Sequence, residues 1–212
     1  MSSLYDQRLA MIGGSHVQPS LRDIVRGIEK ESLRVVPAGG LAKTEHPACL
    51  GSALTNPYIT TDYSEALLEF ITPPCSDLDE LLGILDSIHR FTYQCLDQEL
   101  LWTASMPCIL RGDEDIPVAR YGESNIGKMK TVYRLGLGHR YGRAMQAISG
   151  IHYNFSMGDS FWRAYQKAMA NRDSPQAFKN NQYLALIRNF RRLAWLLVYL
   201  FGASPALCKS FI

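Results

Sequence analysis

The sequence predicts an α+β protein with a mainly antiparallel sheet that is backed by helices. Segments with the two-residue period of a strand and segments with the helical period are both present. They follow one another without the regular strand–helix alternation that builds a parallel sheet. The chain has 212 residues, which is enough for one sizeable core and short for two. We therefore expect residues 1–212 to belong to one domain.

The first strand is expected at residues 24–36, IVRGIEKESLRVV. Alternation places Val25, Gly27, Glu29 and Glu31 on the same side of this strand. The sequence PAGG follows directly, and proline and glycine together indicate a turn. The segment is thus typical of the first arm of a hairpin.

Two further segments have strand character. Residues 58–72 are expected to start irregularly and to end in the apolar run ALLEFIT, which Pro73 stops. Residues 148–156 alternate, with His152 and Asn154 on the polar face. The alternation gives residues 148–156 one polar face, whereas Glu69 in the run ALLEFIT could lie on the wet side of a sheet or be buried with a partner.

Residues 77–99 have the clearest helical pattern in the chain. Asp77 can cap the helix, with Glu80 three residues later, and apolar residues then recur at the helical period. Further helices are expected at residues 125–142, 158–170 and 176–201. The most apolar stretch, residues 193–203, is too short to cross a bilayer, and we interpret it as part of a buried helix.

Composition excludes several classes of protein. The net charge is +2, so nothing in the total charge indicates binding to nucleic acid or to a membrane. The five cysteines are odd in number and form no CxxC, which fits neither a disulfide framework nor a zinc site. The N-terminal sequence has no signal-peptide pattern. A reducing cytoplasm is the expected compartment.

Acidic residues provide the main functional signal. Glu29 and Glu31 lie roughly 6.6 Å apart along one strand face, although strand glutamates usually face solvent, and that interpretation remains open for the pair alone. Glu69 lies inside the apolar run ALLEFIT, and Asp62 precedes it. If these strands converge with that of His152, the carboxylates would repel one another unless a hard cation such as Mg²⁺ were bound. Magnesium among carboxylates is typical of phosphate chemistry.

Other motifs are weaker. The sequence has no GxGxxG, no P-loop, no GxSxG and no HExxH. Lys128, Lys130 and Arg134 lie near an expected helix start. They could hold a phosphate or a carboxylate, or they could form a solvated basic face.

Several long motifs resemble the proteobacterial type of glutamate–cysteine ligase, also called gamma-glutamylcysteine synthetase. They are RGIEKESLRV, LGSALTNPYITTDYSEALLEFITPP, YGESNIGKMKTVYRLGLGHRYGRAMQAISGIHYNFS and LFGASPA. The resemblance runs in order over residues 21 to 210. It implies the first step of glutathione synthesis, in which ATP phosphorylates the γ-carboxyl of L-glutamate and the amine of L-cysteine attacks the acyl phosphate. The implied fold is like that of glutamine synthetase, with a curved antiparallel sheet backed by helices.

The resemblance also implies roles for individual residues. The positions that match the magnesium site of the family are Glu29, Glu31, Asp62, Glu69 and His152. Those that match its cysteine pocket are Tyr63, Tyr133, Leu137 and Gln146, and Tyr63 stands where we expect phenylalanine in the family. Arg134 is expected to contact a carboxylate or a phosphate during catalysis. ATP, L-glutamate and L-cysteine are the expected small-molecule partners.

Members of this family continue well beyond residue 212. We therefore expect these residues to be the N-terminal portion of a single glutamate–cysteine ligase catalytic domain, incomplete and inactive by itself. Two alternatives stay open. One is a non-catalytic remnant that binds a metal or a partner, and the other is a magnesium-dependent phosphotransfer enzyme that acts on another acid. The sequence does not indicate the oligomeric state.

Overall fold

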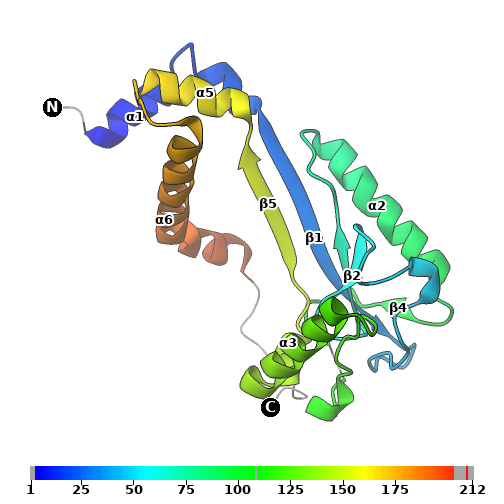
Figure 1. Ribbon diagram of the computed structural model, residues 1–212. Helices are drawn as coiled ribbons and strands as arrows, with labels where there is room; N and C mark the ends of the chain where they lie inside the picture. Colours follow the sequence, from blue (N-terminus) through cyan, green and yellow to red (C-terminus); the bar gives the residue numbers. More distant parts are fainter. Residues whose placement is uncertain (1–2, 108, 203–208, 210–212) are drawn as a thin grey trace. The chain divides into compact units, whose positions relative to one another are not determined.

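The computed structural model describes residues 3–107, 109–202 and 209, and these fall into two compact units. One unit comprises residues 3–25 and 155–202, and the other comprises Arg26–Asn154 together with residue 209 (Figure 1). Each unit has its own hydrophobic core, so each is described by itself.

The sheet orders its strands β2-β3-β1-β4, and β5 also pairs with β1. The strands are β1 (Ile24–Val35), β2 (Ile59–Thr61), β3 (Leu67–Ile71), β4 (Leu100–Leu101) and β5 (Ile151–Met157). The pairings β1–β3, β1–β4 and β2–β3 are all antiparallel, which confirms the expected kind of sheet. After β1 the chain turns through Gly39, whose φ of 86° suits glycine, and Val36 N–H donates to Gly40 O at 2.9 Å. The predicted PAGG turn is therefore confirmed.

Helix α2 (Leu78–Cys95) covers one face of this sheet (Figure 1). Asp77 caps it by accepting the Glu80 N–H at 2.8 Å, as its sequence predicted. Leu68 and Phe70 of β3 pack with Ile88 of the helix in one buried cluster. Because side chains alternate along a strand, Leu67, Glu69 and Ile71 lie on the other face.

A second cluster lies around β1 and the segment that follows β2. Leu33, Leu67, Tyr63 and Ile116 form its centre, and Leu137 packs against it. Leu137 belongs to α3 (Asn125–Tyr141), and the short helix α4 (Arg143–Gln146) follows. The remaining short helices of this unit are η2 (Ala48–Leu50) and η3 (Asp113–Asp115).

The smaller unit is mainly helical. Its helices are α1 (Leu4–Ile12), η1 (Gln18–Arg22), α5 (Asp159–Ala168) and α6 (Pro175–Phe201). Phe161, Trp162 and Tyr165 of α5 pack with Val17 and Phe178 in its core. Edge-on and tilted ring pairs join α5 to the N-terminal part of α6.

The structure corrects two expectations and adds one helix. The irregular start predicted for residues 58–72 contains strand β2. Helix α1, which the sequence analysis did not predict, begins with a capping box between Ser3 and Asp6. Residues 193–203 were expected to be buried, but Trp195 and Tyr199 are 64% and 81% exposed. Apolar residues become buried only when another element packs on them, and among the described residues of this unit the core ends at the first turns of α6. No described helix has the length and apolarity needed to span a bilayer.

Candidate functional site

Three glutamates share the sheet face that lies opposite α2. The register pairs Glu31 of β1 with Glu69 of β3, and Glu29 lies two residues away on β1. Because the two strands are in register, all three carboxylates lie on one side. Glu29, Glu31 and Glu69 therefore lie on the same face of the sheet.

The side chain of Glu29 is held by two residues of β5. His152 Nδ1 lies 3.1 Å from Glu29 Oε2, and Asn154 Nδ2 donates to Oε1 at 2.9 Å. The Asn154 hydrogen bond, together with that of His152, lowers the pKa of Glu29. In turn, the hydrogen bond to Glu29 raises the pKa of His152, with help from the negative charges of Glu31 and Glu69. The pair fixes an ionised carboxylate beside an imidazole.

Glu31 is held by the backbone that precedes β5. Gly150 N–H donates to Glu31 Oε2 at 2.7 Å, and Glu31 N–H donates to Gly150 O at 3.0 Å. Burial nevertheless raises the pKa of Glu31, and the charges of Asp62 and Glu29 add to that rise. Glu31 is thus well positioned but is electrostatically unfavourable in its ionised form.

Glu69 is affected both by burial and by the charges of three neighbouring carboxylates. Burial raises its pKa to about 7, and the charges of Asp62, Glu29 and Glu31 act in the same direction. Within the described part of the chain, no hydrogen bond reaches its carboxylate. A cation among these groups would relieve the repulsion. We call Glu29, Glu31, Asp62 and Glu69 the carboxylate cluster.

Asp62 lies just after β2 and is held through its backbone. Its N–H donates to Leu67 O at 2.9 Å, while its carbonyl accepts from Tyr121 Oη at 2.9 Å and from Arg134 Nε. The guanidinium of Arg134 also lies over the Tyr121 ring, 4.6 Å from its centroid. The Asp62 side chain therefore stays available next to Glu69.

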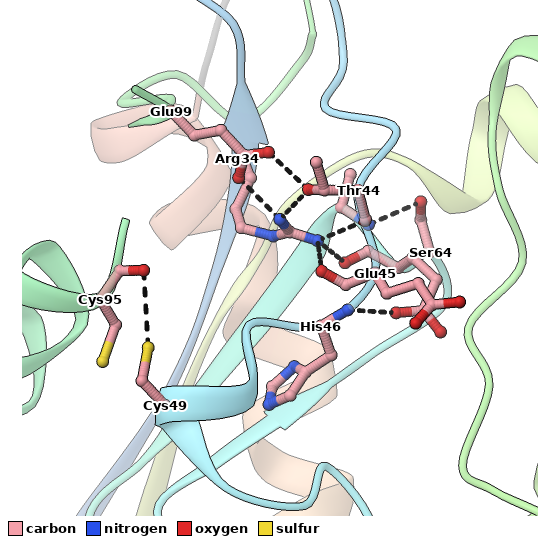
Figure 2. A network of polar contacts seen from close by, with 10 residues as sticks. Arg34, Thr44, Glu45, His46, Cys49, Ser64, Cys95 and Glu99 are labelled. Carbon is pink, nitrogen blue, oxygen red and sulfur yellow. Dashed lines mark hydrogen bonds and ion pairs between the residues drawn. The ribbon is translucent and has the colours of Figure 1, made fainter. Parts of the chain in front are cut away.

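The buried Arg34, shown in Figure 2, supports the segment that follows Asp62. Arg34 of β1 pairs with Glu99 at 2.6 Å and donates to the Glu65 carbonyl at 2.8 Å. The Glu65 carboxylate then accepts the backbone N–H groups of His46 and Arg120. This network fixes the segment that joins β2 to β3, and with it the position of Asp62.

The chemistry of the carboxylate cluster suits a hard cation, because its donors are oxygens. However, within residues 3–107, 109–202 and 209 no three His, Cys, Asp or Glu side chains are gathered so as to hold a metal ion. The side chains share one face and one electrostatic environment without forming a closed ligand shell. The donor types fit Mg²⁺, and the ligand assignment remains a prediction.

The four residues expected in a cysteine pocket differ widely in exposure. Tyr63 is buried at 2%, whereas Tyr133 is 64% exposed on α3. Leu137 packs on the core that contains Tyr63, and Gln146 is half-buried at the end of α4. The structure therefore brings Tyr63 and Leu137 together, and the common pocket remains a prediction.

Sequence reasoning did not assign a role to three residues that position the site. Asn154 had a signal, since it lies two residues from His152 on the polar face of the same strand. Gly150 and Tyr121 had none, because they act through a backbone N–H and through a contact distant in sequence. Only the tertiary fold reveals such partners.

The structure thus has the architecture of an α+β protein with an open antiparallel sheet and a carboxylate-lined face. The sequence profile described as glutamate–cysteine ligase matches residues 9–212. The chain belongs to the glutamate–cysteine ligase family.

Curated relatives agree with this assignment over the whole chain. The glutamate–cysteine ligases of Hahella chejuensis and Alcanivorax borkumensis are 58% and 56% identical to it, over 100% and 98% of its length. The chain spans only 40% and 39% of those two proteins. It therefore covers about two fifths of the relatives that it matches.

Two solved structures resemble the chain in three dimensions. A glutamate–cysteine ligase from Francisella tularensis in complex with AMP has a TM-score of 0.82 and 42% identity, over 90% of this chain and 37% of that one. A bifunctional glutathione synthetase from Pasteurella multocida has a TM-score of 0.84 and 34% identity, over 92% of this chain and 25% of that one. The fold class predicted from sequence is thereby confirmed.

Proposed function

We propose that this chain supplies the metal-binding face of an ATP-dependent ligase that joins the γ-carboxyl of L-glutamate to L-cysteine, the first step of glutathione synthesis. The observation that carries the proposal is the carboxylate cluster on one sheet face of a member of this family. A relative solved in complex with AMP supports a nucleotide as co-substrate.

Glu29, Glu31, Asp62, Glu69 and His152 would hold Mg²⁺. Bound there, Mg²⁺ would neutralise phosphate oxygens of ATP during phosphoryl transfer to the glutamate carboxyl. The chain's own contribution is positioning. His152 and Asn154 fix the Glu29 carboxylate, and Gly150 fixes that of Glu31.

We further propose that the residues that contact the substrates lie beside the carboxylate cluster. Tyr63, Tyr133, Leu137 and Gln146 would contact cysteine, for which aromatic and apolar walls are suitable. Arg134 would contact a carboxylate or a phosphate. In the structure its Nε donates a hydrogen bond to the Asp62 carbonyl. We place the protein in the cytoplasm, and the free thiols of Cys49, Cys75 and Cys95 support a reducing compartment.

Metal binding can be tested on residues 1–212 directly. Mn²⁺ serves as a paramagnetic probe for the Mg²⁺ site, and free Mn²⁺ is measured by electron paramagnetic resonance. We expect Glu31→Gln and Glu69→Gln to weaken binding by about tenfold or more, because each replaces a charged carboxylate by a neutral amide with a single oxygen. Glu123→Gln is the matched control, since its side chain is 93% exposed. Equal affinities in all four proteins would count against the assignment.

The ligase activity has to be tested in a longer protein, because these residues cover only about two fifths of the relatives that they match. We suggest a chimera in which these residues replace the matching portion of the Hahella chejuensis ligase, which is 58% identical. ADP release that needs both glutamate and cysteine supports the ligase function. A folded chimera that releases ADP with another acid and amine would instead indicate a different phosphotransfer enzyme, and a folded chimera with no release would indicate a non-catalytic remnant.

A further inference from the structure

Two cysteines distant in sequence meet at the edge of the α2 layer. Cys49 lies in η2, and Cys95 is the last residue of α2. Their neighbours Leu50 and Leu96 belong to one buried cluster, against which Cys95 itself packs. The hydrophobic core therefore holds the two segments against each other.

The side chain of Cys49 is in direct contact with the backbone of Cys95 (Figure 2). The Cys49 thiol donates to the Cys95 carbonyl oxygen at 3.5 Å, and it lies close enough to the Cys95 thiol to influence its pKa. Both are free cysteines. Because the Cys49 thiol already reaches the backbone of Cys95, the two sulfur atoms need little backbone movement to bond.

The two thiols differ in accessibility. Cys49 is exposed, whereas Cys95 is half-buried, and burial together with the Cys49 contact raises the pKa of Cys95 to about 11. An oxidant in solution therefore reaches Cys49 first, while Cys95 stays protonated beside it. Cys75 is buried and hydrogen-bonds to the Pro73 carbonyl.

We propose that Cys49 and Cys95 form a redox-sensitive pair that closes to an intrachain disulfide when a peroxide oxidises Cys49. The Cys49 thiol takes one oxygen from hydrogen peroxide, which yields a sulfenic acid and water. The Cys95 sulfur then attacks the Cys49 sulfur, the S–O bond breaks, and a disulfide and a second water form. Two equivalents of a small thiol reverse the reaction and leave as their own disulfide. This inference is independent of the proposed ligase function.

The disulfide would connect segments 46 positions apart. It would tie η2, which precedes β2, to the C-terminal end of α2. A cross-link over such a loop restricts the unfolded chain. We expect the oxidised protein to unfold at a temperature roughly 5–15 °C higher than the reduced protein.

The test is to treat reduced residues 1–212 with hydrogen peroxide and to block the remaining thiols. Cleavage before aspartate separates all candidates, since residues 23–61 contain only Cys49 and residues 86–96 contain only Cys95. We expect mass spectrometry to find these two peptides joined, with the mass of the pair lower by two hydrogens. Dithiothreitol should separate them and should lower the unfolding temperature again.

Variants distinguish this pair from random oxidation. Cys49→Ser and Cys95→Ser should abolish both the cross-link and the temperature shift, and Cys75→Ser should keep both. The proposal is overturned if peroxide converts Cys49 to higher oxides without the cross-linked peptide. It is equally overturned if Cys49 joins another cysteine or a second chain instead, or if the cross-linked protein unfolds at the temperature of the reduced one.

Discussion

Replacing Arg34 with methionine should destabilise the larger unit strongly. Arg34 is fully buried, and its guanidinium pairs with Glu99 at 2.6 Å and donates to Thr44 and to the carbonyls of Glu45 and Glu65 (Figure 2). Methionine fills a similar volume but leaves the Glu99 carboxylate, 14% exposed, without its partner. Breaking a buried ion pair in this way costs about 3–5 kcal/mol. Because domains are stable by only about 5–15 kcal/mol, this loss is a large fraction of the total.

Hydrogen exchange followed by mass spectrometry measures this effect separately for each unit. Amides of β1 and β3 should exchange faster in Arg34→Met, and the unit that contains Arg26–Asn154 should unfold at a lower urea concentration. Arg34→Lys should unfold at a urea concentration between those of the parent and Arg34→Met, because an ammonium group keeps the charge but lacks the planar set of donors of a guanidinium. Arg90→Met is the control, since that arginine is 76% exposed and its helical pair is worth only about 0.3–0.5 kcal/mol. The reasoning is refuted if Arg34→Met and Arg90→Met unfold at the same urea concentration.

Three further predictions concern the site. Gly138→Ala should lower the melting temperature, because the added Cβ would lie 2.2 Å from the Tyr63 hydroxyl. Gly136→Ala is the matched control: its Cβ meets nothing within 4 Å, so the better helix propensity of alanine should raise the stability by up to about 1 kcal/mol. If calorimetry shows melting-temperature shifts of the same sign for both variants, the explanation is wrong. In metal-free buffer, the stability that protonated Glu69 provides is fully present below pH 4.5 and is lost as the pH rises through about 7, since its folded pKa lies above its ordinary value. Urea unfolding at several pH values should therefore show that Glu69→Gln loses less stability than the parent as the pH rises. Added Mg²⁺ should reduce the loss in the parent. Identical pH profiles for the two proteins would reject the raised pKa of Glu69. In the chimera, Tyr133→Ala should raise the KM for cysteine more than the KM for ATP in steady-state assays. Equal increases in the two KM values would contradict the assignment of Tyr133 to the cysteine pocket.

Much of the larger unit was predictable because its signals are local. The two-residue period of β1 already placed Glu29 and Glu31 on one side, and the capping and period of α2 predicted Asp77 at its start. The strand character of β5 likewise placed His152 on a polar face. Such features depend on neighbours two to four positions away, which the sequence alone displays.

Other features required the fold. The sequence could not show that Glu31 lies opposite Glu69, because strand register depends on how two distant segments pair. The same reason explains why the support of Asp62 by Tyr121 and the contact of Cys49 with Cys95 were not predicted. These contacts arise from packing between elements rather than from any local pattern.

The sequence by itself determined the class of fold, most of the elements and the identity of the acidic residues. The tertiary structure alone decided which side chains are buried. Burial raises the pKa of Glu69, and it also encloses Tyr63. It also decided that the apolar end of α6 is exposed, although its composition indicated burial. The physical reason is that hydrophobicity creates a tendency to be buried, whereas burial itself requires a second surface in contact.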